Sequence, residues 1–97
     1  MAYEVIVAPE ASEQYSRLRA FERAEVRDAI RTHLETQPTR TSRSRIKRLR
    51  GLRQPQFRLS VGKIRVYYDV LETQVHVLAI LTKAEAMTWL NEKGVPK

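Results

Sequence analysis

The sequence predicts a single α+β domain: an N-terminal strand and helical hairpin packed on a small, mainly antiparallel sheet, with a C-terminal helix. The length of 97 residues suits one compact domain. Apolar side chains recur at helical spacing between residues 9 and 36, and they alternate with polar ones between residues 56 and 70. No linker, repeat or low-complexity segment interrupts the chain, so we assign residues 1–97 to one domain.

The N-terminal part is predicted to form a strand and two helices. Residues 2–8 are rich in β-branched side chains, which favour a strand. Pro9 suits the first turn of a helix that we expect to continue to about Arg19. A second helix is expected from residue 21 to residue 36, where Gln37-Pro38 ends it. The apolar residues expected on its packed face are Phe21, Val26, Ile30 and Leu34.

The C-terminal half is predicted to form a three-stranded antiparallel meander followed by a helix. Residues 56–62 and 63–70 alternate cleanly, and a tight turn joins them at Gly62-Lys63. Residues 74–81 are apolar on both faces, as in a central strand. The final helix is expected over residues 82–94, with Thr82 as cap and Gly94 as stop.

The two faces of the meander differ in chemistry. One face carries apolar side chains that the helices must cover: Phe57, Leu59, Ile64, Val66 and Tyr68. The opposite face carries Arg58, Ser60, Arg65 and Tyr67. We therefore expect a basic, partly aromatic surface on a rigid sheet.

Positive charge is concentrated in the middle of the chain. The net charge is +7, yet no acid occurs between Glu35 and Asp69, a window that holds ten of the 18 lysines and arginines. The other eight bases are outnumbered by 11 acids, which leaves the rest of the chain at −3. This split favours an acidic partner, namely nucleic acid, an anionic membrane or an acidic protein segment; the alternative is a solvated, solubilising loop.

The densest part of this window is TSRSRIKRLRG, residues 41–51. We expect a loop that closes into a short turn, with Ile46 and Leu49 as anchors at helical spacing. Because it leads into the first strand of the meander, its charge should join that of Arg58 and Arg65 in one positive footprint, with nucleic-acid bases stacking on Tyr67.

Composition argues against several other classes of protein. The chain has no cysteine, which removes disulfides, thiolate metal sites and a cysteine nucleophile. The N-terminus lacks the pattern of a signal peptide, and the apolar stretch 75–81 is too short to span a bilayer. No carboxylate pair, metal-ligand cluster or glycine-rich phosphate loop is visible. We expect a cytoplasmic protein without metal, cofactor or membrane partner.

Four motifs of the C-terminal half belong together: the turn Leu49-Arg50-Gly51, the strand FRLSV (57–61), the strand IRVYY (64–68) and the strand end VHVLAIL-TK (75–83). With them, the sequence resembles the RelE/ParE superfamily of toxins from bacterial type II toxin–antitoxin systems. The opening YEVIVAPEASEQYSRL (3–18) also suits the family's first strand and helix, so the resemblance covers nearly the whole chain and is most specific over residues 49–70. This resemblance implies the RelE-like fold. It also implies either a ribosome-dependent mRNA endonuclease of the RelE type or a gyrase poison of the ParE type, neutralised in both cases by a small antitoxin.

The resemblance assigns roles residue by residue. Arg65 matches the arginine that stabilises the transition state, and Arg58 matches a residue that orients RNA phosphates. Lys83 lies where the last strand ends, but Ala84 stands where a further arginine is common. Near the position of a base-stacking tyrosine the chain has Leu90, with Trp89 beside it. The residues assigned to RNA binding are Arg45, Lys47, Arg48, Arg50 and Tyr67.

Two functions follow from this pattern. The first is a metal-independent, ribosome-dependent mRNA endonuclease whose partners are the ribosome, mRNA and a cognate antitoxin, with operator DNA contacted only through the antitoxin complex. The second is a non-enzymatic protein: a gyrase poison, or a degenerate toxin that acts through antitoxin binding and operon autoregulation. We expect His33, His76 and Trp89 to be structural, and an acidic antitoxin segment to cover part of residues 40–65 or to displace the final helix.

Overall fold

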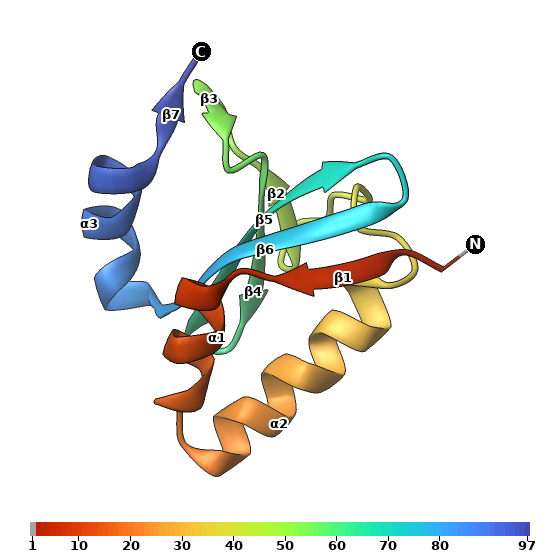
Figure 1. The fold of residues 1–97 in the computed structure, drawn as a ribbon, viewed down its shortest axis with the longest axis vertical. Coiled ribbons are helices and arrows are strands. Elements are labelled where there is room, and N and C mark those ends of the chain that lie inside the picture. Colours follow the sequence, from red (N-terminus) through yellow and green to blue (C-terminus); the bar gives the residue numbers. More distant parts are fainter. Residues whose placement is uncertain (1) are drawn as a thin grey trace.

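A five-stranded sheet with helices on both faces forms the centre of the molecule (Figure 1). The computed structural model describes residues 2–97. The strand order is β1-β6-β5-β4-β2, and β3 and β7 form a separate two-stranded ribbon. The elements are β1 (Glu4–Val7), α1 (Pro9–Ser16), α2 (Ala20–Ala29), the π-helical turn η1 (Ile30–Leu34), β2 (Ile46–Arg48), β3 (Leu52–Gln54), β4 (Phe57–Val61), β5 (Ile64–Leu71), β6 (Gln74–Thr82), α3 (Lys83–Lys93) and β7 (Val95–Pro96).

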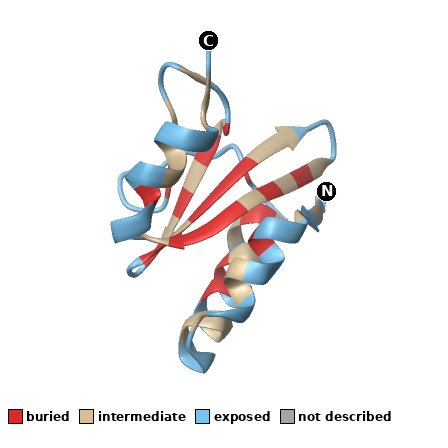
Figure 2. Cartoon of the chain, turned by 60° about the vertical axis from the view of Figure 1, so that its left-hand side comes forward, coloured by how far each residue is buried: buried red, intermediate tan, exposed pale blue. Residues whose placement is uncertain are grey.

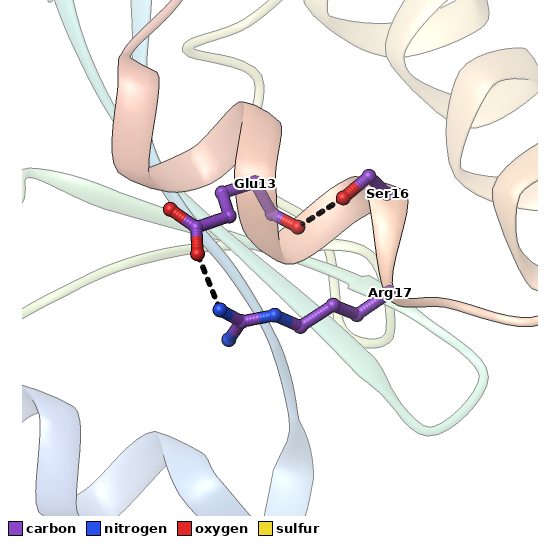
Figure 3. Close-up of polar contacts among 3 residues, drawn as sticks. All are labelled: Glu13, Ser16 and Arg17. Atoms are coloured by element: carbon purple, nitrogen blue, oxygen red, sulfur yellow. Dashed lines mark hydrogen bonds and ion pairs between the residues drawn. The ribbon is translucent and has the colours of Figure 1, made fainter.

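Helix α1 begins at Pro9 as expected but ends at Ser16, before the expected Arg19. The hydroxyl of Ser16 donates to the carbonyl of Glu13 at 2.6 Å (Figure 3). The Arg17 amide turns instead to the carbonyl of Gln14 at 3.2 Å. The Arg17 guanidinium pairs with the Glu13 carboxylate. Competition by a serine side chain for a backbone carbonyl therefore ends the helix one turn early.

Helix α2 starts where the sequence predicted, and its last turn is π-helical. The amide of Glu35 donates to the carbonyl of Ile30, five residues earlier, at 3.1 Å. Val26 and Leu34 are fully buried, but Phe21 is 57% exposed. The expectation that Phe21 lies on the packed face is wrong, because the first turn of α2 projects beyond the end of the sheet (Figure 1).

The meander β4-β5-β6 matches the prediction. Gly62, with a positive φ of 56°, turns the chain between β4 and β5, and β6 pairs on its other side with β1 in parallel. The apolar side chains of β4 and β5 that point to α1 and α2 are buried together with those of the helices. Figure 2 shows this burial along the strands and on the sides of α1 and α2 that face them. We call this side of the sheet the inner face and the other side the outer face.

Three short strands were not predicted. The segment Ile46–Arg48 pairs with β4 in antiparallel register, with Ile46 opposite Leu59, so the expectation of a loop that closes into a short turn is wrong for these residues. Ile46 and Leu49 are still anchors, but they pack against the inner and the outer face respectively. The ribbon of β3 and β7 brings the C-terminus beside residue 52. Such short strands carry no alternating pattern, and tertiary pairing alone defines them.

The cap and stop of α3 are those expected from the sequence. The side chain of Thr82 accepts from the amide of Glu85 at 3.3 Å, the Glu85 carboxylate accepts from the amide of Thr82 at 3.1 Å, and Gly94 follows the last turn. The Glu85 carboxylate also accepts from the hydroxyl of Thr82 at 2.8 Å, and the two bonds that it accepts from Thr82, from the amide and from the hydroxyl, lower the pKa of Glu85. Among residues 2–97, no helix is both long enough and apolar enough to cross a bilayer.

The inner face contains one buried hydrogen bond that ties the sheet to the end of α2. The hydroxyl of Tyr68 donates to the carbonyl of Pro38 at 2.6 Å, and burial raises the pKa of this phenol. Replacing Tyr68 by Phe should lower the free energy of unfolding by about 1–3 kcal/mol, because the Pro38 carbonyl loses its donor in a dry site. Chemical denaturation measures this change.

A second tyrosine provides the control. Tyr15 also donates to a carbonyl, that of Arg23 at 3.0 Å, but the bond is only part-buried. Water can replace the lost hydroxyl there, so Tyr15→Phe should be the milder change. Equal losses in the two variants would show that burial does not set the strength of the Tyr68 bond.

Candidate nucleic-acid interface

The outer face of the sheet brings the predicted basic residues of β2, β4 and β5 together. Register places Lys47 opposite Arg58, and Arg58 opposite Tyr67. Two residues after Arg58 on β4, Ser60 lies opposite Arg65 of β5. Arg58 and Arg65 are therefore diagonal neighbours rather than directly opposed, within reach of one ligand for long side chains. Both guanidinium charges act on the phenol of Tyr67.

Arg65 is held by the hairpin turn. Its Nη1 donates to the carbonyl of Gly62 at 2.8 Å and to that of Ile64 at 3.0 Å. These bonds fix the guanidinium against the backbone through a single nitrogen. The rest of the donor fork faces no carboxylate among residues 2–97, where the ion pairs are Glu13–Arg17 and Arg27–Asp28. A preorganised guanidinium of this kind is suited to a phosphate group.

Arg58 is half-buried, and its Nε is buried without a hydrogen-bond partner in the described part of the chain. A buried donor without an acceptor lowers stability by about 1–3 kcal/mol, so such groups mark positions where a ligand can contribute the missing acceptor. Asp69, the first acidic residue after the acid-free window, is not the acceptor for Arg58 Nε. Asp69 accepts from the Gln54 side chain and from the Gln56 amide, both at 2.7 Å.

Tyr67 was expected on the open surface, and that expectation is wrong. The residue is 2% exposed because Trp89 of α3 stacks on its ring, with 5.3 Å between the ring centroids and 21° between their planes. Burial raises the pKa of the phenol, and the charges of Arg58 and Arg65 oppose that rise. At neutral pH the hydroxyl is protonated, so it can donate a proton or a hydrogen bond but is a poor base.

Helix α3 is the cover of the outer face. Ala86, Trp89 and Leu90 pack on the outer side of β5 and β6, and the indole N–H of Trp89 donates to Glu10 Oε1 at 3.0 Å. The prediction that Trp89 is a sheet-covering anchor is confirmed. The covering role of α3 could be expected from the apolar outer residues of β6, Ala79 and Leu81, which need a partner.

Lys83 is the first residue of α3 and is exposed. Its backbone amide donates to the carbonyl of Lys63 at 2.7 Å, which ties the start of the helix to the β4–β5 turn. The preceding Leu81 lies opposite Arg65. The fold thus brings Lys83 to the same end of the sheet as Arg65, while its role in chemistry stays a prediction.

The structure divides the basic cluster of residues 41–51 instead of presenting it as one footprint. Lys47 lies beside Arg58 on the outer face. Arg48 lies on the inner side, its guanidinium carbon 5.2 Å from the centre of the Phe57 ring. Arg45 reaches the carbonyl of Ser60 with Nη1 at 3.5 Å, and Arg50 is exposed in the turn before β3. Alternation along β2 causes the split between Lys47 and Arg48.

The two histidines lie outside the outer-face cluster of Arg58 and Arg65. His76 is half-buried in β6 and shares a 3.0 Å hydrogen bond with the side chain of Gln74. His33 is half-buried at the end of α2, where burial and the charge of Arg45 lower its pKa. No group of three histidine, aspartate or glutamate side chains within residues 2–97 is placed to hold a metal ion.

Comparison with known proteins identifies the fold. No family model matches the chain, and no curated protein matches it. Among solved structures, a RelBE toxin–antitoxin complex from Mycobacterium tuberculosis is similar with a TM-score of 0.71 and 23% identity, over 84% of this chain and 99% of that one. An archaeal RelE–RelB complex from Pyrococcus horikoshii gives 0.69 and 20%, over 86% and 97%. A mutant of Escherichia coli toxin RelE in the free state gives 0.71 and 22%, over 95% and 94%. At these identities the similarity establishes a RelE-like fold, as the sequence predicted.

The stack between Trp89 and Tyr67 gives a prediction about pH. Trp89→Ala should lower the pKa of Tyr67 toward the ordinary tyrosine value near 10, because burial is the main cause of its rise and removing the indole admits water. Site-resolved tyrosine NMR during a pH titration measures this pKa. Trp89→Phe keeps an aromatic cover and should leave the pKa raised; a folded Trp89→Ala protein with an unchanged Tyr67 titration would contradict the assignment.

Proposed function

We propose that this protein is the toxin of a type II toxin–antitoxin system and that it cleaves mRNA on the ribosome. The carrying observation is the pair of arginines on the outer face, Arg58 and Arg65, which have no carboxylate partner in the described chain. Lys47 adds a third positive charge opposite Arg58. The RelE-like fold supports the class, and the toxins among the similar structures were solved with antitoxins or free.

The proposed chemistry is attack of a ribose 2′-hydroxyl on the adjacent phosphate, with departure of the 5′-oxygen. Negative charge grows on the phosphorane, and preorganised guanidinium groups stabilise it. Arg65, oriented by the Gly62 and Ile64 carbonyls, is assigned to that charge, and Arg58 to positioning the phosphate. Neither arginine is a suitable base, since an arginine stays protonated. The proton of the attacking 2′-hydroxyl is therefore proposed to pass to solvent water, and Tyr67 or Lys83 is the proposed proton donor to the leaving 5′-oxygen.

The proposed partners are a cognate antitoxin, the ribosome and mRNA, and operator DNA is proposed to be contacted only through the antitoxin complex. An antitoxin segment rich in acidic residues fits the window between residues 36 and 68, whose charge has no internal counterpart. No cofactor is part of the proposal.

A second candidate is a non-enzymatic toxin, either a gyrase poison or a protein that acts through antitoxin binding alone. Two observations favour it. Tyr67 is buried beneath Trp89. In addition, Ala84 stands where the resemblance expects a further arginine. Cleavage of programmed ribosomes selects the first candidate, whereas stabilised gyrase–DNA cleavage complexes select the gyrase poison.

The first prediction from this proposal concerns Arg65. Arg65→Ala should slow cleavage of mRNA on programmed ribosomes by about a hundred- to a thousandfold, the usual effect of losing one transition-state electrostatic donor. Arg65→Lys should also be impaired, because an ammonium does not reproduce the guanidinium fork. Arg58→Ala should lose less, and Lys83→Ala should be slowed only if Lys83 donates the proton.

Single-turnover cleavage is the measurement, with circular dichroism and co-purification of the antitoxin as controls for folding. Lys93→Ala, at the last turn of α3, is a matched loss of one exposed charge and should cut normally. A folded Arg65→Ala protein that cuts at the wild-type rate would rule out the site, and a wild-type protein that cuts nothing would favour the non-enzymatic candidate.

The second prediction uses neighbouring residues of β2 that face opposite sides. Lys47→Ala should reduce the magnitude of the salt slope of RNA binding by about 0.7, the value for one phosphate contact on a single strand. Arg48→Ala removes the same charge from the next residue, but on the inner side over Phe57, and should leave the slope nearly unchanged. Fluorescence anisotropy with a labelled RNA over a range of salt concentrations measures both. Equal changes would mean that binding responds to net charge rather than to the outer face.

A further inference from the structure

A second basic site lies at the end of α2, and neither Arg58 nor Arg65 of the outer face is among its lining residues. It is a hollow of about 430 Å³ between the π-helical turn η1 and the loop that leads into β2. The polar side chains that line it are those of Thr32, His33, Thr36, Gln37, Arg40, Ser42 and Arg45. The buried side chain of Ile46 closes it on the side of the sheet.

The hollow contains positive charge without a compensating anion. No aspartate or glutamate is among its lining residues. Arg40 donates only to a neutral oxygen, Gln37 Oε1, at 3.0 Å, and Arg45 to the carbonyl of Ser60 at 3.5 Å. Neither forms an ion pair in the described chain. Each guanidinium therefore retains donors for a ligand that carries negative charge.

The negative end of the helix does not supply that charge. The carbonyl of Ile30 accepts from the amide of Glu35, and that of His33 from the amide of Gln37. The carbonyl of Thr32 accepts from the hydroxyl of Thr36 at 2.7 Å. Since these terminal carbonyls are satisfied locally, they do not hold the arginines, and the hollow is an unneutralised basic site.

The pKa of His33 also reflects the positive charge of the hollow. It lies inside the hollow, and both burial and the Arg45 charge lower its pKa, so it is neutral at pH 7. A bound anion would neutralise the Arg45 charge, which would raise the pKa of His33 and favour the imidazolium form. The side chains would then offer two guanidinium groups, one imidazole and the hydroxyls of Thr32 and Ser42 around one centre. The π-helical turn that shapes the hollow is a feature often found at functional sites.

We propose that this hollow is a phosphate-binding site in which Arg40 and Arg45 contact the phosphate oxygens and His33 and the surrounding hydroxyls complete the site. The ligand chemistry is a phosphoryl group, supplied either by the backbone of a nucleic acid or by a free nucleotide. The site is separate from the arginine pair proposed for cleavage, and its occupancy can be measured without any cleavage. Failure of one proposal therefore leaves the other intact.

The test is an NMR titration of the whole protein with three probes: inorganic phosphate, AMP, and a short all-deoxy oligonucleotide that lacks the attacking 2′-hydroxyl. Each probe that binds should raise the pKa of His33, whereas the ring signals of His76 should not respond, because His76 lies in β6 outside the hollow. Response to the oligonucleotide alone assigns the site to nucleic-acid backbone, and an equal response to AMP or phosphate assigns it to a free ligand. No change in His33 with any probe overturns the proposal.

Matched variants distinguish binding in the hollow from non-specific attraction to the positive charge of the loop. Arg40→Gln and Arg45→Gln should each weaken binding about tenfold, the loss of one charge-assisted hydrogen bond. Arg43→Gln removes the same charge from the same loop, but Arg43 does not line the hollow, and it should bind as the wild type does. Affinity is taken from amide shifts rather than from the His33 pKa, because removing the Arg45 charge itself raises that pKa. Equal weakening in all three variants would overturn the site; if one variant of the pair fails to fold, the other decides.

Discussion

The two-residue period of β4 and β5 is the constraint on which the rest of the structure depends. It sends alternate side chains of one hairpin to opposite faces of the sheet, so a single stretch of sequence supplies both the core and the basic surface. The inner face must be covered to bury residues such as Leu59 and Val66, and α1 and α2 do this. A chain of this length can cover only part of the second face, and α3 covers the part that is aromatic and aliphatic. The charged part stays open.

Sequence reasoning predicted the elements whose determinants are local. The alternation of β4 and β5, the glycine turn at Gly62, and the cap at Thr82 each depend on residues within a few positions, and each is confirmed. The early end of α1 also has a local cause, the hydroxyl of Ser16, but propensity alone does not reveal that a side chain will displace a backbone donor. The strand β2 is different in kind, since three residues without alternation become a strand only by pairing with β4.

The candidate site was predicted as far as it depends on one hairpin. Arg58 and Arg65 share a face because of the register between adjacent strands, which the turn at Gly62 fixes. The burial of Tyr67 depends on Trp89, a residue of another element, and the sequence contains no local sign that the two rings meet. The division of the basic cluster has the same origin. Whether Lys47 and Arg48 act together is settled by a strand pairing that a count of arginines cannot show.

The arrangement of charge in this protein lowers the stability of the isolated chain. Between residues 36 and 68 the basic side chains use neutral oxygens, an aromatic ring or no partner at all, while the ion pairs of the described chain lie on α1 and α2. The like charges of Arg58 and Arg65 on the outer face, and of Arg40 and Arg45 around the hollow, repel one another and oppose folding slightly. A bound polyanion would remove this repulsion and satisfy the open donors in the same step. The free energy that the fold gives up by holding these like charges close together would then contribute to the free energy of binding.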